Sequence, residues 1–125
     1  MDLWFTPSEN SQVHLESLSF EGFVEFDIAT KTQIKQGQWG DYVRSAKYAL
    51  SKQFNLKYGI NGVLQGSLPV GGISSSAAVL IAYVMAFAKA NGISLKPFEV
   101  VLIASEAERE YIVTGSGMYC FRSKE

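Results

Sequence analysis

The stretch Gly66-Ser-Leu-Pro-Val-Gly-Gly-Ile-Ser-Ser-Ser-Ala-Ala78 decides how the rest of this chain is interpreted. An alternating apolar segment over residues 58–68 leads into it, which is typical of a strand. An apolar run with helical spacing follows it as far as Ala90. The sequence therefore predicts a strand, a tight loop and a helix in direct succession.

The loop between this strand and this helix has the features of an anion site. Pro69, Gly71 and Gly72 leave its backbone bare, so another group can approach closely. The three serines at 74–76 are N-cap candidates for the helix. A helix N-terminus carries unpaired N–H groups and the positive end of the helix dipole, so we expect phosphate to bind there. The alternative is a capped helix start that binds nothing.

Composition and charge exclude several classes of protein. The 125 residues are 47% hydrophobic and 18% charged, with a net charge of -1, which predicts one globular domain and neither nucleic acid nor anionic membrane as a partner. The N-terminus has no signal-peptide pattern, and the longest apolar run is short for a membrane span. Cys120 is the one cysteine, so no internal disulfide can form and a reducing cytoplasm is the expected location.

The periodicity of apolar residues predicts an α+β fold in which an antiparallel or mixed sheet packs on helices. Three early strands, joined by short turns as antiparallel neighbours, are expected at 3–5, 13–18 and 22–28. Helices are expected near 39–54, 74–90 and 97–112, with Gly92 ending the second and Pro97 beginning the third. His14, the one histidine, is expected on a surface strand and lacks neighbours that would make it a metal ligand.

Helical spacing also predicts which side chains form the core. In the first helix the core stripe is Trp39, Tyr42, Val43, Ala46, Ala49, Leu50 and Phe54. In the third helix the predicted face is mostly core and consists of Phe98, Val101, Leu102, Ser105, Glu108 and Ile112. Glu108 is the exception on that face, because an acid beside an apolar stripe either reaches water or has a partner.

The central stretch closely resembles the ATP-binding motif of the GHMP kinases, the galacto-, homoserine, mevalonate and phosphomevalonate kinases. Three consecutive serines before Ala are characteristic of the galactokinase branch, and Trp39-Gly-Asp-Tyr42-Val is similar to a helix start in galactokinases. The resemblance implies a ribosomal protein S5 domain 2-like fold and ATP as a ligand. The residues that it places at ATP are Pro69, Val70, Gly71, Gly72, Ile73, Ser74, Ser75, Ser76 and Ala77.

A second resemblance concerns a metal. Ser105-Glu-Ala-Glu108 looks like the Gln/Glu-Ala-Glu segment of galactokinases, whose second Glu coordinates magnesium together with the last serine of the triplet. Carried over, the implied Mg²⁺ ligands are Ser76 and Glu108. This agrees with the usual coordination of magnesium, which takes few oxygens from protein and the rest from phosphate and water.

The chain departs from the galactokinase pattern on the sugar side. Cys120 stands where the family has the Asp that faces the sugar hydroxyl, so no catalytic residue is assigned. The sugar-binding segment with its Glu-His pair and the C-terminal half of the kinase have no counterpart here. The resemblance covers roughly Leu3 to Met118, and residues 113–125 read as a divergent tail. We expect 1–125 to be one partial domain of the GHMP kinase N-terminal type.

These patterns predict a galactokinase-like sugar kinase that transfers phosphate from ATP to a sugar hydroxyl, with galactose as the first candidate. The chain would be a truncated or degenerate copy and inactive alone, and its partners would be ATP, a sugar and the missing halves of the kinase. The alternative is a catalytically inactive relative that binds nucleotide or acts as a regulatory or binding module. A third hypothesis, an unrelated α+β domain, is disfavoured by the combined motifs.

Overall fold

The computed structural model describes residues 2–18, 22–30, 39–65 and 73–113, with side chains described for 78–110 of the last range. In chain order the elements are β1 (Asp2–Pro7), β2 (Gln12–Ser17), β3 (Phe23–Asp27), α1 (Gly40–Ser51), β4 (Ile60–Gln65), α2 (Ile73–Ala90), α3 (Pro97–Ala107) and the π-helical η1 (Glu108–Val113). The expected α+β fold is confirmed, with the three helices close to their predicted ranges.

The strands form one mixed sheet in the order β1-β4-β2-β3. β1 pairs with β4 and β2 with β3 in antiparallel fashion, whereas β2 and β4 run parallel. The expectation of early strands as successive antiparallel neighbours is right for β2 and β3 and wrong for β1 and β2, because β4 lies between them. Alternation tells which side chains face the core, but it does not tell which strand lies next to which.

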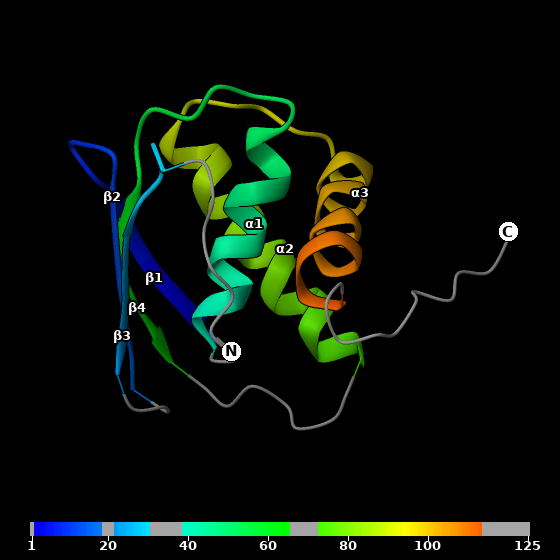
Figure 1. The fold of residues 1–125 in the computed structure, drawn as a ribbon, viewed down its shortest axis with the longest axis horizontal. Helices are drawn as coiled ribbons and strands as arrows, with labels where there is room; N and C mark the ends of the chain where they lie inside the picture. Colours follow the sequence, from blue (N-terminus) through cyan, green and yellow to red (C-terminus); the bar gives the residue numbers. More distant parts are fainter. Residues whose placement is uncertain (1, 19–21, 31–38, 66–72, 114–125) are drawn as a thin grey trace, which may run out of the picture.

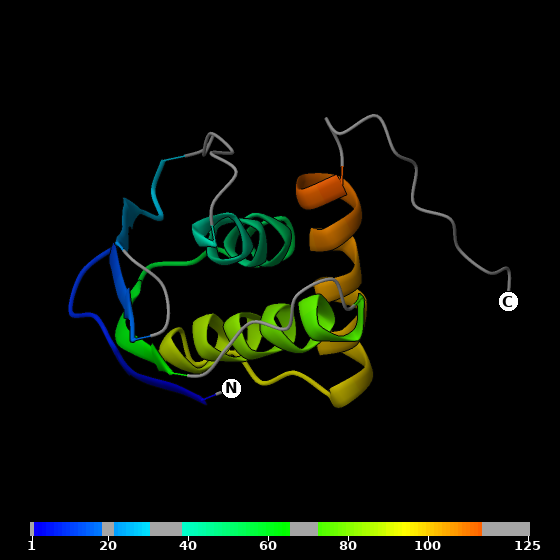
Figure 2. The ribbon, with the colours of Figure 1, turned by 90° about the horizontal axis from the view of Figure 1, so that it is seen from below.

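The helices cover one face of this sheet in two layers. α1 and α2 lie side by side against the sheet, and α3 lies on their far side (Figures 1 and 2). The strands contribute Val13, Leu15 and Val24 to the core from the covered face. The predicted stripe of α1 is also confirmed: Val43, Ala46, Ala49 and Leu50 are buried, and Trp39, Tyr42 and Phe54 are half-buried against the same core.

α2 contributes many of the largest buried side chains. Leu80, Tyr83, Val84 and Phe87 have no exposed surface. As predicted, the helix ends before Gly92, whose φ of 68° is the left-handed value that glycine adopts at low cost. α3 then begins at Pro97 as expected.

The predicted core face of α3 is wrong. Phe98, Val101 and Leu102 are 61%, 52% and 62% exposed. The buried side chains of this helix are instead Val100, Ile103, Ala104 and Ala107. α3 is apolar around most of its circumference, so its sequence presents two plausible core faces, and packing against α1 and α2 decides between them.

The buried Tyr83 provides a test of this packing. Its hydroxyl is enclosed and has no hydrogen-bond partner among the described residues, and burial raises the pKa of this phenol. An unsatisfied buried polar group destabilises a fold by about 1–3 kcal/mol, so we expect Tyr83→Phe to raise the free energy of unfolding by about 1 kcal/mol. Urea unfolding of the two chains measures the difference.

Tyr48→Phe is the matched control for that measurement. The Tyr48 hydroxyl donates to Glu110 Oε1 at 3.2 Å, so its removal should lower stability slightly instead of raising it. A Tyr83→Phe chain less stable than the wild type by about 1 kcal/mol or more would show that this hydroxyl has a partner after all.

His14 lies on β2 with its side chain 35% exposed, at the surface strand position that the sequence predicts. Its Nε2 is 3.0 Å from Glu16 Oε2, and its Nδ1 is 3.2 Å from Glu25 Oε2. Hydrogen bonds to Glu16 and then to Glu25 raise the pKa of His14 above its ordinary 6.5. The protonated ring is therefore the form that the folded chain favours.

This pair of carboxylates predicts a pH dependence with a definite sign. The stabilising contribution of protonated His14 is complete below pH 6.5 and is lost as the pH rises through the raised pKa of the folded chain. The ring protons of this single histidine, followed by NMR, should titrate with a midpoint above 6.5. Glu16→Gln should lower that midpoint, whereas Glu9→Gln should not; a wild-type midpoint at or below 6.5 would contradict the arrangement.

Candidate functional site

The predicted phosphate loop is described only from its helical side. Pro69, Val70, Gly71 and Gly72 lie outside the described residues. α2 begins at Ile73, so the serines at 74–76 occupy its first turn, and the expectation that one of them is the N-cap is wrong. The residues predicted to meet phosphate thus include the first turn of a long helix, whose free N–H groups lie at this end.

This end of α2 lies on the side of the molecule where α3 and η1 are found. α2 contacts both of these elements, and the views in Figures 1 and 2 agree on their arrangement. Glu108 is the first residue of η1. The fold therefore brings the helix that follows the glycine loop into contact with the segment that carries the predicted metal ligand.

Glu108 has an unusual setting for a glutamate. It is half-buried, and this burial raises the pKa of its carboxyl group. Within the described ranges its carboxylate makes no hydrogen bond or ion pair, although Glu106 and Glu110 on either side both pair with Lys52. A half-buried carboxylate with no cation beside it is one to which a cation can bind favourably.

The residue types of the predicted metal pair suit magnesium. A serine hydroxyl and a carboxylate are the hard oxygen donors that Mg²⁺ prefers. In the described part of the chain no cluster of three or more His, Cys, Asp or Glu side chains could hold a metal. In the metal pair predicted from the sequence, the Ser76 hydroxyl, phosphate and water would supply the other oxygens. The side chain of Ser76 lies outside the described residues.

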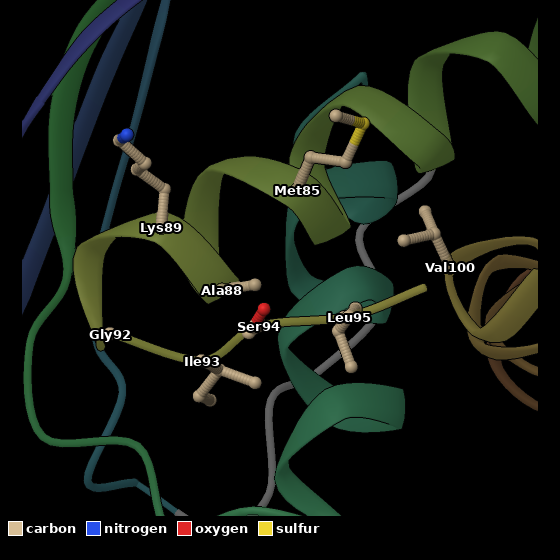
Figure 3. A pocket seen from close by; sticks show the side chains of 8 residues that line it. All are labelled: Met85, Ala88, Lys89, Gly92, Ile93, Ser94, Leu95 and Val100. Atoms are coloured by element: carbon tan, nitrogen blue, oxygen red, sulfur yellow. The ribbon is translucent and has the colours of Figure 1, made fainter. Parts of the chain in front are cut away.

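A hollow of about 470 Å³ lies at the other end of α2 (Figure 3). In the figure Met85 and Val100 lie on one side of it, Ile93 and Leu95 lie below, and the Lys89 side chain extends away from Leu95. Its lining is mostly apolar and consists of Met85, Ala88, Lys89, Gly92, Ile93, Ser94, Leu95 and Val100. This composition and this place, far from the first turn of α2, do not suit a phosphate group.

Sequence reasoning missed the residues that hold η1. Lys52 Nζ lies 3.1 Å from Glu106 Oε2 and closer still to Glu110 Oε1, at 2.6 Å. These partners are more than fifty positions apart in the chain, and no motif links them. Cys120, in contrast, was singled out from the sequence and lies outside the described residues.

None of the helices in the described part of the chain is long and apolar enough to cross a membrane.

Comparison with known families and relatives bears on these observations. The family model for the GHMP kinases N terminal domain matches residues 41–121. A galacturonokinase from Arabidopsis thaliana is 38% identical in an alignment that covers 93% of this chain and 32% of that protein. A galactokinase from Clostridium perfringens is 31% identical over 82% of this chain and 27% of its own length. The chain thus spans about a third or less of the relatives it matches.

Two solved structures show the same fold. Galactokinase from Lactococcus lactis, crystallised with galactose, superposes with a TM-score of 0.80 at 24% identity over 92% of this chain and 31% of that one. Mevalonate kinase from Methanococcus jannaschii gives a TM-score of 0.70 at 18% identity over 86% of this chain and 36% of its own. At such identities the likeness concerns the arrangement of the sheet and helices.

Proposed function

The chain belongs to the GHMP kinase family, whose N-terminal domain it matches over most of its length, and from this membership we propose that it is the ATP-binding part of a galactokinase-type sugar kinase. The observation that carries the proposal is the glycine and serine stretch entering α2, inside the matched region. The relatives named galactokinase and galacturonokinase support a sugar of the galactose type as the acceptor. A cytoplasmic location accords with the single cysteine.

The proposed mechanism divides the phosphate-binding work among three parts of this chain. The amides of the loop Gly71–Ser76 and the positive end of the α2 dipole hold the phosphates of ATP. Ser76 and Glu108 would hold Mg²⁺, which when bound would supply charge neutralisation to the phosphate oxygens. These groups contribute position and charge, and phosphoryl transfer depends on little else from the protein on the donor side.

The acceptor side of the reaction is proposed to come from elsewhere. Cys120 replaces the carboxylate expected to face the sugar hydroxyl, and a thiol is a poor substitute in accepting its proton. We propose that the acceptor side comes from the part of a kinase that this chain does not span. Exposed apolar side chains on α2 and α3, namely Met85, Phe98, Val101 and Leu102, support a covering partner.

A second candidate function is an inactive relative that binds nucleotide without transferring phosphate. The observation that favours it is the same replacement at Cys120, since the ATP-binding stretch is kept while the acceptor group is not. The two candidates share the nucleotide site and differ in turnover. An activity assay distinguishes them. In this assay the chain is mixed with the part of a kinase that it does not span, supplied by a relative that is truncated at its N-terminus.

Nucleotide affinity tests the part that both candidates share. Gly72→Val places a branched side chain where phosphate is proposed to approach the backbone, so ADP affinity should fall by at least about tenfold, the scale on which a lost close contact acts. Titration calorimetry of the full chain measures it.

Ala78→Val is the matched control, since Ala78 is exposed on α2 beyond the stretch proposed to meet the phosphates. Its affinity for ADP should equal that of the wild type. Equal affinities in the wild-type and Gly72→Val chains would reject the site.

The isolated chain is expected to have no appreciable sugar kinase activity. Removing a positioned general base commonly lowers the rate by about 10²–10⁴-fold, and an unheld acceptor adds the loss of proximity. A coupled assay of ADP release with magnesium and either galactose or galacturonate measures it.

Cys120→Asp should not restore turnover, because the sugar would still be unheld. Turnover of about one per second by the pure chain, a typical kinase rate, would show that the acceptor site has been misplaced.

A further inference from the structure

A network of charged and polar side chains joins the end of α1 to the start of η1. Lys52, the residue that follows α1, places its Nζ 3.1 Å from Glu106 Oε2 and 2.6 Å from Glu110 Oε1. One turn earlier on α1, the Tyr48 hydroxyl donates to the same oxygen of Glu110 at 3.2 Å. Glu110 is thus held by two donors, Tyr48 on α1 and Lys52 directly after it, and Lys52 alone links it to Glu106.

The two carboxylates that Lys52 binds lie on either side of Glu108. Glu106 belongs to the last turn of α3, and Glu110 belongs to η1. The backbone changes from α-helical to π-helical geometry at Glu108 itself. A π-helical turn is wider than an α-helical turn and has i→i+5 hydrogen bonds. Such turns are rare in proteins, and those that occur are frequently found at functional sites. The direction in which Glu108 points therefore depends on keeping this transition in place.

Overall stability is a poor explanation for this network. The Lys52 side chain is 39% exposed, and exposed ion pairs contribute little to the free energy of unfolding. Such a contact acts on local geometry, because one ammonium group binds Glu106 and Glu110, on either side of the point where the widened turn begins. The side chain of Glu108, between them, makes no hydrogen bond or ion pair within the described ranges.

We propose that Lys52 is a positioning residue for Glu108, holding the start of η1 so that the carboxylate stays where a divalent cation on the nucleotide can reach it. This inference rests on the proposed function, in which Glu108 contributes to the Mg²⁺ site. Groups that orient a metal ligand commonly change metal affinity by about 10–100-fold when they are removed. Lys52 does not itself touch nucleotide, metal or sugar in this proposal.

The test separates metal affinity from nucleotide affinity. ADP binding to the full chain is measured by calorimetry in the presence of a chelator and then with Mn²⁺, which replaces Mg²⁺ as a probe visible by electron paramagnetic resonance. We expect Lys52→Met to leave metal-free ADP affinity unchanged and to lower Mn²⁺ affinity in the ADP complex by about tenfold. Lys52→Arg, which keeps a cation at this place, should restore most of it.

Two further variants make the outcome decisive. Glu108→Gln should lose Mn²⁺ affinity as Lys52→Met does, and Lys57→Met, at an exposed lysine beyond α1, should behave as the wild type. Full Mn²⁺ affinity in Lys52→Met, an equal loss of metal-free ADP affinity, or normal Mn²⁺ affinity in Glu108→Gln would each overturn the role of Lys52. Failure of the wild-type chain to bind ADP would instead refute the proposed function, and the role of Lys52 with it.

Discussion

The burial of α2 is the constraint on which the other elements depend. This helix has apolar side chains on nearly all sides, and it contacts β1, β4, α1, α3 and η1. An all-round apolar helix is stable only when neighbours enclose it, so the sheet and two helices are arranged around it. Because α2 begins directly after the glycine stretch, fixing the helix also fixes where that stretch joins the fold. The core and the proposed phosphate site are therefore positioned by the same packing.

The sequence predicts the fold where a single periodicity operates. α1 has one apolar stripe, and the structure buries it as the spacing predicts. α3 is apolar on most sides, and there the predicted face, with Phe98 and Leu102, is exposed. The buried ion pair between Asp41 and Arg44, 3.1 Å apart, also escapes prediction, because charged residues are read as exposed unless a partner is known. Spacing alone does not encode these tertiary choices.

The candidate site also has some features that the sequence predicts and others that it does not. The motif and its order of residues predict the loop, the helix and Glu108, because each is a local pattern. Two features needed the three-dimensional arrangement: the contact of α2 with η1, and the change of helical geometry at Glu108. A 3.6-residue period predicts an unbroken α-helix through this region, so a π-helical turn leaves no signal in it. Lys52 is distant in sequence from both of its acidic partners, and only folding brings them together.

The central place of β4 in the sheet has a consequence for the order in which the chain can fold. β1 and β2 precede α1, yet each needs β4, the strand that follows α1, as its neighbour. A chain emerging from the ribosome can form the β2–β3 hairpin early, since these strands are adjacent in sequence. Among the described strands β1 pairs with β4 alone, so its partner is complete only when residues 60–65 have been synthesised. Its edge is thus open during synthesis, and such edges are the places where nascent chains aggregate or engage chaperones.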